Sequence, residues 1–325
     1  KILANLNITE TRLPQDGRIN TAIGVSPVDL RISTLPTVLG EKVVIRILDL
    51  SNALMKLDEL DFSQANYTAY TNLIKQPSGL ILLTGPTGSG KTSTLYASLN
   101  YLNEDHVNII TIEDPVEIQL EGINQVQVNA NNNLTFSKGL RSILRQDPNI
   151  IMIGEIRDQE TAEIAIPAAL TGHLVFSTIH TNSAIDTVPR LFDMGIEPYL
   201  VVSALSGVVA QRLVRRICRD CRTKRELTTL EKDIFHRYEI DVETIYEGKG
   251  CSSCQQKGYR GRIAIQELFV INDKIREMLM ENKSVSEIRT YAQDNDMAFL
   301  LQDGLEKVKA GLTTMEEMMK VTIQS

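Results

Sequence analysis

Residues 79–92 read GLILLTGPTGSGKT, an apolar run that leads into a glycine-rich turn and ends in Gly-Lys-Thr. The part from Gly85 to Thr92 fits the pattern G-x-x-x-x-G-K-[ST] at every position. In that pattern the glycines let backbone N–H groups turn inward around phosphate oxygens, and the following helix presents its N-terminus to the same anion. The stretch therefore predicts a strand, a phosphate-binding loop and a helix, in that order.

The side chains of this loop predict contacts with ATP. Lys91 is placed to neutralise the β- and γ-phosphates, and the hydroxyl of Thr92 is placed to bind Mg²⁺. A chance glycine-rich turn is the alternative, but the strand before the loop and the helix-like STLYASLNYL after it argue against that interpretation. The expected nucleotide-binding residues are Gly85, Pro86, Thr87, Gly88, Ser89, Gly90, Lys91, Thr92 and Ser93.

Short apolar runs recur after this point, separated by stretches of helical character. The runs are GLILLTG, NIITIEDP, NIIMIGEI and HLVFSTIH. Continuous β-branched runs of this length are typical of buried parallel strands, so we expect an α/β fold with a doubly wound domain. Before it, the alternating runs VDLRIST and EKVVIRIL indicate antiparallel strands of a small α/β domain.

The expected division of the chain follows these changes in pattern. Residues 1–54 form part of the small N-terminal domain, and residues 55–78 form a linker. Residues 79–207 form the doubly wound domain. Residues 208–325 form a mostly helical C-terminal region, in which 208–262 hold the cysteines.

Composition limits the classes of function. The net charge of −7 argues against a general nucleic-acid coat protein, although it says nothing of a local basic patch. No apolar run approaches the ~20 residues of a membrane span, and no secretory signal pattern is present. We therefore expect a cytoplasmic protein. The chain begins with Lys1 rather than Met, so we also expect a fragment with upstream sequence removed.

Acidic clusters follow two of the apolar runs. EDPVE begins at Glu113, and GEIRD contains Glu155. Hydrolysis of a nucleotide needs carboxylates that hold Mg²⁺ and orient water, and the carboxyl ends of parallel strands bring such groups to one edge of a sheet. The alternative for each acid is a solvated loop residue or a helix N-cap, which fits Asp158 best. The run STIHTN places His180 where it can sense a γ-phosphate, and a structural histidine is an equally good interpretation from the residues alone, whereas His173 is expected to be structural.

The cysteines form two C-x-x-C pairs, Cys218 with Cys221 and Cys251 with Cys254. This spacing predicts a tetrahedral Zn²⁺ site, which is structural because four sulfur ligands leave no open position. Disulfides are the alternative, and a cytoplasmic setting disfavours them. The basic stretch QRLVRRICRDCRTKR lacks interleaved aromatic residues that would stack on bases. We therefore expect a charged face balanced by acidic neighbours or by another subunit, not a nucleic-acid groove.

In this order along the whole chain, the motifs resemble those of the secretion ATPases of type II secretion systems and type IV pilus assembly. RLPQDGRI and LRISTLPTVLGEKVVIRILD resemble the second N-terminal domain of that family. GPTGSGKT resembles its Walker A motif, ITIEDPVE its acidic Asp box, NIIMIGEIRD its Walker B region and STIHTN its His box. QRLVRRIC, the C-x-x-C pairs and GYRGRIAIQELF resemble its C-terminal module.

The resemblance implies a RecA-like ATPase core, a PAS-like N-terminal domain and a homo-hexameric ring. It assigns Glu155 as the acid that polarises or positions the attacking water, and Glu113 as support for the Mg²⁺–water arrangement. It leaves open which of the two is the general base. Arg31 and Arg46 match arginines that reach the phosphates from the N-terminal domain, and His180 matches a residue that responds to the γ-phosphate.

The implied function is a cytoplasmic motor, peripheral to the inner membrane, that powers assembly of a type IV pilus. Its partner would be an inner-membrane platform protein, through which alone it would contact the membrane, and no nucleic acid is expected. The zinc module favours assembly over retraction, because retraction motors of the same superfamily lack it. The pseudopilus motor of type II secretion is the alternative. A nucleic-acid translocase and a small-molecule phosphotransferase fit the motifs less well.

Two departures from the family pattern stand out. Pro167 occupies a position where the family usually carries a polar residue, and a proline inside a helix removes a hydrogen bond and tends to kink it. The chain is also expected to begin inside the family's second N-terminal domain and to lack the first. Cyclic-dinucleotide binding, which that domain provides in some members, is therefore not assigned to this chain.

Overall fold

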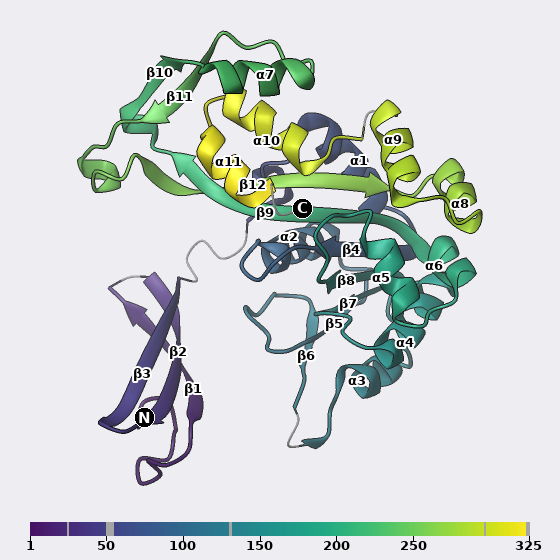
Figure 1. The fold of residues 1–325 in the computed structure, drawn as a ribbon. Coiled ribbons are helices and arrows are strands. Elements are labelled where there is room, and N and C mark those ends of the chain that lie inside the picture. Colours follow the sequence, from purple (N-terminus) through teal and green to yellow (C-terminus); the bar gives the residue numbers. More distant parts are fainter. Residues whose placement is uncertain (25, 50–54, 130–131, 296, 323–325) are drawn as a thin grey trace. The chain divides into compact units, whose positions relative to one another are not determined.

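The computed structural model describes the chain except for residues 25, 50–54, 130–131, 296 and 323–325 (Figure 1). It divides into two compact units, Lys1–Met55 and Lys56–Ser325. The division falls within one residue of the expected end of the N-terminal part. Among the described residues, no helix is long and apolar enough to pass through a lipid bilayer.

The first unit contains a three-stranded antiparallel sheet of β1 (Gln15–Ile23), β2 (Ser26–Thr37) and β3 (Gly40–Asp49), in that spatial order. The alternating runs identified in the sequence form β2 and β3. Within the described residues, the regular elements of this unit are these strands, so helices of the expected α/β domain are not among them.

The second unit is built on a seven-stranded sheet with the order β12-β9-β4-β8-β7-β5-β6. Its strands are β4 (Gly79–Thr84), β5 (Ile109–Glu113), β6 (Asn124–Gln127), β7 (Ile150–Ile153), β8 (Leu174–Ile179), β9 (Leu205–Ile217) and β12 (Tyr259–Val270). All neighbouring strands pair in parallel except β12, which is antiparallel to β9. The four apolar runs become β4, β5, β7 and β8, as predicted, and the mixed α/β fold is confirmed.

Burial explains why these four runs form the middle of the sheet. Every residue of β4, β5, β7 and β8 is buried. Each fully buried Leu or Ile contributes roughly 1.5–3 kcal/mol relative to an exposed one. A strand that is apolar on both faces is stable in the middle of a sheet. There, neighbouring strands pair with its backbone N–H and C=O groups, and helices cover both of its side-chain faces.

Helices connect and cover the strands. Their bounds are α1 (Gln64–Ile74), α2 (Lys91–Leu102), α3 (Phe136–Ile143), α4 (Gln159–Leu170), α5 (Thr187–Asp193), α6 (Pro198–Ala204), α7 (Thr229–Arg237), α8 (Asp273–Met280), α9 (Val285–Asp294), α10 (Leu300–Lys309) and α11 (Met315–Thr322). A short 3₁₀ helix, η1 (Leu57–Glu59), precedes α1. The expected linker 55–78 therefore contains ordered helical structure that belongs to the second unit.

The region after residue 207 differs from its expected helical character. β9 and β12 are long strands that extend the central sheet, so the expected boundary at 207/208 falls inside β9. The first eight residues of β9 are buried, because β4 and β12 flank this part of the strand, and polar exposure begins further along. The charged residues of QRLVRRIC are the reason that the sequence did not predict β9, because only the first half of this strand is apolar.

Pro167 lies inside α4, and the helix is described as continuous from Gln159 to Leu170. Its side chain is exposed, so the missing N–H removes a hydrogen bond on the solvent face of the helix. Asp158 is the N-cap of α4 and accepts a hydrogen bond from Thr161 N at 2.8 Å. Asp158 therefore has the helix N-cap role that the sequence analysis gave as the alternative to a catalytic acid.

The cysteine-bearing insert projects from the ends of β9 and β12. It contains a two-stranded sheet of β10 (Arg222–Glu226) and β11 (Thr244–Gly248) with α7 between them in the sequence (Figure 1). Near the base of this insert, α11 is fastened to β9 by Glu317. This carboxylate accepts from Arg215 Nη2 at 2.7 Å, from Arg215 N at 3.2 Å and from Lys320 Nζ at 2.9 Å.

The hydrogen bond from Arg215 lowers the pKa of Glu317 from 4.5 to about 2, although burial opposes the shift. A lowered pKa means that ionised Glu317 stabilises the fold above about pH 4.5 and that this stabilisation is lost as the pH falls toward about 2. We predict that Glu317→Gln lowers the melting temperature at neutral pH and that the difference from wild type shrinks in acid. Thermal unfolding followed across the acid range measures this. Glu316→Gln, on the same helix but exposed, is the control, and a pH-independent difference would contradict the prediction.

Candidate nucleotide site and cysteine cluster

The carboxyl ends of four neighbouring parallel strands meet at one edge of the sheet. β4, β8, β7 and β5 lie side by side in that order. The glycine-rich loop follows β4, the loop with His180 follows β8, the loop with Glu155 follows β7, and Glu113 ends β5. All the site residues predicted in the second unit, except the cysteines, thus belong to one edge.

The glycine-rich loop lies too close to Gln211 on β9 for side chains at two positions. Gly85 has φ +144°, and a Cβ there would lie 2.4 Å from Gln211 O. Gly90 is the N-cap of α2 with φ +90°, and its Cβ would lie 2.6 Å from Gln211 Nε2. The pattern needs glycine at these positions because β9 lies against the loop.

Lys91 begins α2 and turns its ammonium back over the loop, where Nζ donates to Gly85 O at 2.6 Å and to Pro86 O at 3.1 Å. Burial and the charge of Arg212 lower the pKa of Lys91, and the charge of Glu155 opposes them. Two positive charges, those of Lys91 and Arg212, therefore lie near the loop. Glu155 is close enough to attract the ammonium of Lys91. The exposed N–H groups at the start of α2 and this ammonium make the loop a fit for phosphate oxygens.

Glu155 and His180 lie together, as their strand order predicts. His180 Nε2 is 3.6 Å from Glu155 Oε2, and the guanidinium of Arg157 contacts Glu155 Oε1. The Glu155 side chain is 12% exposed, whereas those of His180 and Arg157 are 54% and 62% exposed. The hydrogen bond to Glu155 raises the pKa of Arg157. A mostly buried carboxylate therefore lies between two groups that reach solvent.

Glu113 has a different environment, because its side chain is buried and both oxygens accept hydrogen bonds. Oε2 accepts from Tyr96 Oη at 2.5 Å, and Oε1 accepts from Thr111 Oγ1 at 2.5 Å and from Gln125 Nε2 at 3.1 Å. Burial, together with the hydrogen bond to Glu113, raises the pKa of Tyr96. Three donors therefore hold this carboxylate in a fixed orientation. Thr111, two residues before Glu113 on one face of β5, was recognisable from the sequence; Tyr96 and Gln125 were not.

A hydroxyl network joins the end of β4 to the loop after β8. Thr84 Oγ1 lies 2.7 Å from Thr181 Oγ1 and accepts from Thr181 N at 2.8 Å. Thr181 Oγ1 is in turn 2.9 Å from Thr187 Oγ1, on α5. These hydrogen bonds join Thr84, the residue before the phosphate loop, to Thr181, the residue after His180. The two loops are therefore held together next to the residues that are expected to bind phosphate.

Gln211 and Arg212 on β9 are site residues that the sequence reasoning missed. Arg212 is buried and donates to Gln211 O at 3.1 Å and to Asn182 O at 2.6 Å. It lines a cavity of about 290 Å³ together with Gly85, Pro86, His180, Thr181, Asn182, Lys320 and Val321. Their basic context had indicated a surface face, and only the burial of β9 shows that they face the phosphate loop.

Arg31 and Arg46 belong to the first unit, where they are direct cross-strand partners on β2 and β3. Arg18 on β1 pairs with Arg31 in turn, which places three arginines in one row across the sheet. Asp29 is buried beside them and accepts from Arg18 Nε at 2.7 Å, with Arg31 Nε at 3.7 Å. The predicted contact of Arg31 and Arg46 with phosphates stays a prediction.

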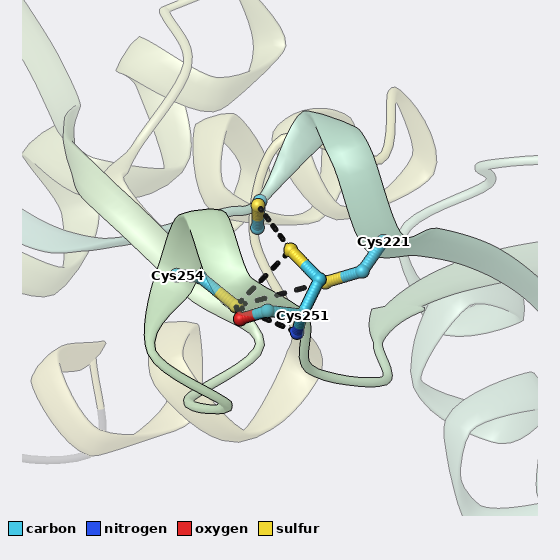
Figure 2. A group of neighbouring side chains, drawn as sticks. Cys221, Cys251 and Cys254 are labelled. Atoms are coloured by element: carbon cyan, nitrogen blue, oxygen red, sulfur yellow. Dashed lines mark hydrogen bonds between the residues drawn. The ribbon is translucent and has the colours of Figure 1, made fainter.

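The four cysteines converge on one point, with all sulfur atoms within 4.8 Å of one another. Figure 2 shows Cys221, Cys251 and Cys254 pointing toward one another from the two turns. The Sγ–Sγ distances are 3.8 Å for Cys218–Cys251, 3.9 Å for Cys221–Cys254 and 3.7 Å for Cys251–Cys254. Tetrahedral Zn²⁺ with Zn–S bonds of ~2.3 Å requires sulfurs ~3.8 Å apart. The cluster fits such an ion, and the cysteines are free thiols rather than disulfides.

Backbone donors surround the sulfur of Cys254. Cys251 N donates to it at 3.2 Å and Gly258 N at 3.3 Å. Burial raises the pKa of this thiol, but these donors and the hydrogen bonds from Cys251 and Cys221 outweigh it and lower the pKa to about 6. N–H groups aimed at sulfur favour the thiolate, which is the form that binds a metal.

Comparisons with known proteins agree with this architecture. The family model described as "Type II/IV secretion system protein" matches residues 1–320. The type II secretion system ATPase E of Vibrio cholerae is 47% identical over 325 residues, which is all of this chain and 64% of that protein. The type IV pilus assembly ATPase PilB of Thermus thermophilus is 48% identical over 326 residues, covering 37% of its length. The chain thus spans less than two thirds of these relatives.

Solved structures show the same fold. The pilus retraction motor PilT with bound ADP superposes with a TM-score of 0.71 at 28% identity, covering 95% of this chain and 78% of that one. The Legionella pneumophila ATPase DotB reaches a TM-score of 0.71 at 20% identity, covering 96% and 78%, and supports the fold alone. Because the family model covers nearly every residue, this chain belongs to the type II/IV secretion system protein family.

Proposed function

We propose that this chain is the motor part of a cytoplasmic ATPase that powers type IV pilus assembly through an inner-membrane platform protein. The observation that carries the proposal is the convergence of the phosphate loop and the Glu155–His180 pair at one strand edge, with His180 Nε2 3.6 Å from Glu155. Membership of the secretion system family supports it. The second unit then contains a RecA-like core, and the first is part of a PAS-like domain.

The residues at the strand edge divide the work of hydrolysis. The loop N–H groups and Lys91 bind the triphosphate of ATP, and the Thr92 hydroxyl holds Mg²⁺, which when bound offsets phosphate charge. Glu155 orients the attacking water, Arg157 contacts its carboxylate, and His180 responds to the γ-phosphate. Glu113 supports this arrangement from the end of β5, where three donors fix its orientation.

Arg31 and Arg46 are proposed to approach the phosphates from the N-terminal domain. Their cross-strand pairing puts two positive charges on one face of a small sheet, which suits a group that accumulates negative charge during phosphoryl transfer. Since they lie in a separate compact unit, domain closure would follow the nucleotide state. We infer that the motor works as a homo-hexameric ring.

The pseudopilus motor of type II secretion is the second candidate. It is favoured by curated relatives such as the secretion ATPase E of Vibrio cholerae, which matches this chain as closely as PilB does, at 47% against 48% identity. Both functions use the same catalytic parts. The tetracysteine cluster is proposed to bind structural Zn²⁺ in either case.

ATP hydrolysis measured against protein concentration, with oligomeric mass read on the same samples, tests the motor. We predict that activity rises with hexamer formation. Glu155→Gln is expected to reduce it by about 100-fold or more, because the water loses its orienting carboxylate. Arg31→Ala is expected to reduce it by a similar factor through lost charge stabilisation.

Glu163→Gln, on the exposed face of α4, and Arg12→Ala, on the surface of the first unit, serve as matched controls. Both are expected to keep wild-type activity. Activity that is independent of assembly and unaffected by Arg31→Ala would mean a self-contained nucleotide enzyme instead of a ring motor.

Metal analysis tests the cysteine cluster. We predict about one Zn²⁺ per chain in protein purified without added chelator, and its loss in Cys254→Ser, because three sulfurs no longer complete the tetrahedron. The melting temperature should fall by several degrees, since metal binding stabilises the fold that forms the site. Ser253→Ala, in the same turn, is the control. Wild-type protein without zinc but with all four thiols reactive would refute the assignment.

A further inference from the structure

A buried pair of amide side chains lies behind the phosphate loop. Gln211 on β9 and Gln266 on β12 are direct cross-strand partners, with 3% and 0% exposure. Two neutral polar side chains at the centre of a sheet lose their hydration and must find partners inside the protein. Their partners lie in two segments that are distant in sequence.

Gln211 contacts the phosphate loop and the helix after it. Its Nε2 donates to Ser89 O at 2.9 Å, and its Oε1 accepts from Thr94 Oγ1 at 2.8 Å. The carbonyl of Ser89 can only accept and thus fixes which end of the amide faces the loop. A Cβ on Gly90 would lie 2.6 Å from the same Nε2, so the loop closes directly onto this side chain.

Gln266 connects Gln211 to residues at the start of the second unit. Its Nε2 donates to Leu60 O at 3.0 Å and to Gln211 Oε1 at 3.4 Å. Both hydrogens of this amide are thereby used, and among the described residues its Oε1 has no partner. Within the described part of the chain the buried Oε1 of Gln266 lacks a partner, which costs free energy. The stabilising contribution of this amide therefore comes from the two hydrogen bonds that its Nε2 donates.

Leu60 is the C-cap of η1. It lies among the first residues of the second unit, which begins at Lys56. This segment has a further link to the same strand, because Ala264 N lies 3.4 Å from Asp61 Oδ2. Asp303 and Lys307 hold β12 in place from α10, through Gln266 N to Asp303 Oδ2 at 2.8 Å and Lys307 Nζ to Ala264 O at 2.7 Å. The strand that carries Gln266 is therefore fixed, and the Gln266 side chain links Leu60 to Gln211, which in turn contacts the phosphate loop.

We propose that Gln211 and Gln266 are positioning residues that couple the phosphate loop to residues 56–63, the entry segment of the second unit. Nucleotide bound by the loop fixes Ser89 and Thr94, these fix the two amides, and the amides fix the carbonyl of Leu60. The inference rests on the proposed nucleotide binding and goes beyond it, since it adds a second place in the chain that responds to the nucleotide. Because coupling is reciprocal, order in 56–63 strengthens nucleotide binding in return.

Hydrogen exchange of the full 325-residue chain, with and without saturating MgADP, tests the coupling. In wild type, MgADP is expected to slow exchange in peptides covering 85–98 and also in peptides covering 56–63, the latter by roughly 5-fold or more. In Gln266→Met, which keeps the volume and removes both donors, protection of 85–98 stays and that of 56–63 is lost. Gln293→Met, on the exposed face of α9, should behave as wild type.

α1 provides an internal reference for the same experiment. Tyr70 Oη lies 2.7 Å from Ser98 Oγ on α2, so α1 is tied to the phosphate-loop helix by a contact that the variant leaves intact. Any protection of 64–74 by MgADP should therefore persist in Gln266→Met. If this variant melts far below wild type, Gln211→Met cuts the same link at its other end and must give the same loss at 56–63.

The outcomes separate the two proposals. Protection of 56–63 that persists in Gln266→Met, or that is absent from wild type while 85–98 is protected, overturns the coupling alone. No protection at either place in wild type means that MgADP does not occupy the loop. That result overturns the proposed function and the coupling with it.

Discussion

The pairing of β4 with parallel neighbours on both sides is the constraint on which the rest of the site depends. β8 and β9 each hydrogen-bond to β4 along its length, so the loops after β4 and β8 leave the sheet at the same level, beside the part of β9 that continues beyond Ala210. The phosphate loop is thereby enclosed between the His180 loop and the residues of β9 that follow Ala210. Thr84 and Gln211, one on each side, convert this proximity into hydrogen bonds.

Much of this edge could be predicted from the sequence, for identifiable reasons. The runs of β4, β5, β7 and β8 are mostly apolar because they are buried on both faces, and each is followed by a glycine or a polar residue that marks its carboxyl end. The C-x-x-C pairs were equally readable, because their spacing is set by the geometry of metal ligation. In these cases local sequence and tertiary environment give the same answer.

The strands β9 and β12 could not be predicted in the same way. Their buried polar residues, such as Gln211, Arg212 and Glu267, look like surface residues when read along the chain. Each is compensated by partners far away in sequence: Glu267, for example, accepts from Ala184 N at 2.5 Å and from Leu300 N at 3.2 Å. Burial raises the pKa of Glu267, which shows how far its environment departs from water. Long-range compensation of this kind leaves no local pattern.

The cysteine cluster has a consequence for how this chain tolerates change in length. Its sulfurs bring the ends of segment 222–250 together, with Cys221 and Cys254 Sγ only 3.9 Å apart. The intervening chain is therefore a closed loop whose ends are fixed whatever lies between them. Doubling the length of such a loop costs only ~0.6 kcal/mol of closure entropy. Length changes in the exposed turns of this insert therefore cost little entropy, whereas Phe235 and Ile245, which pack into the core shared with the central sheet, limit what can replace it.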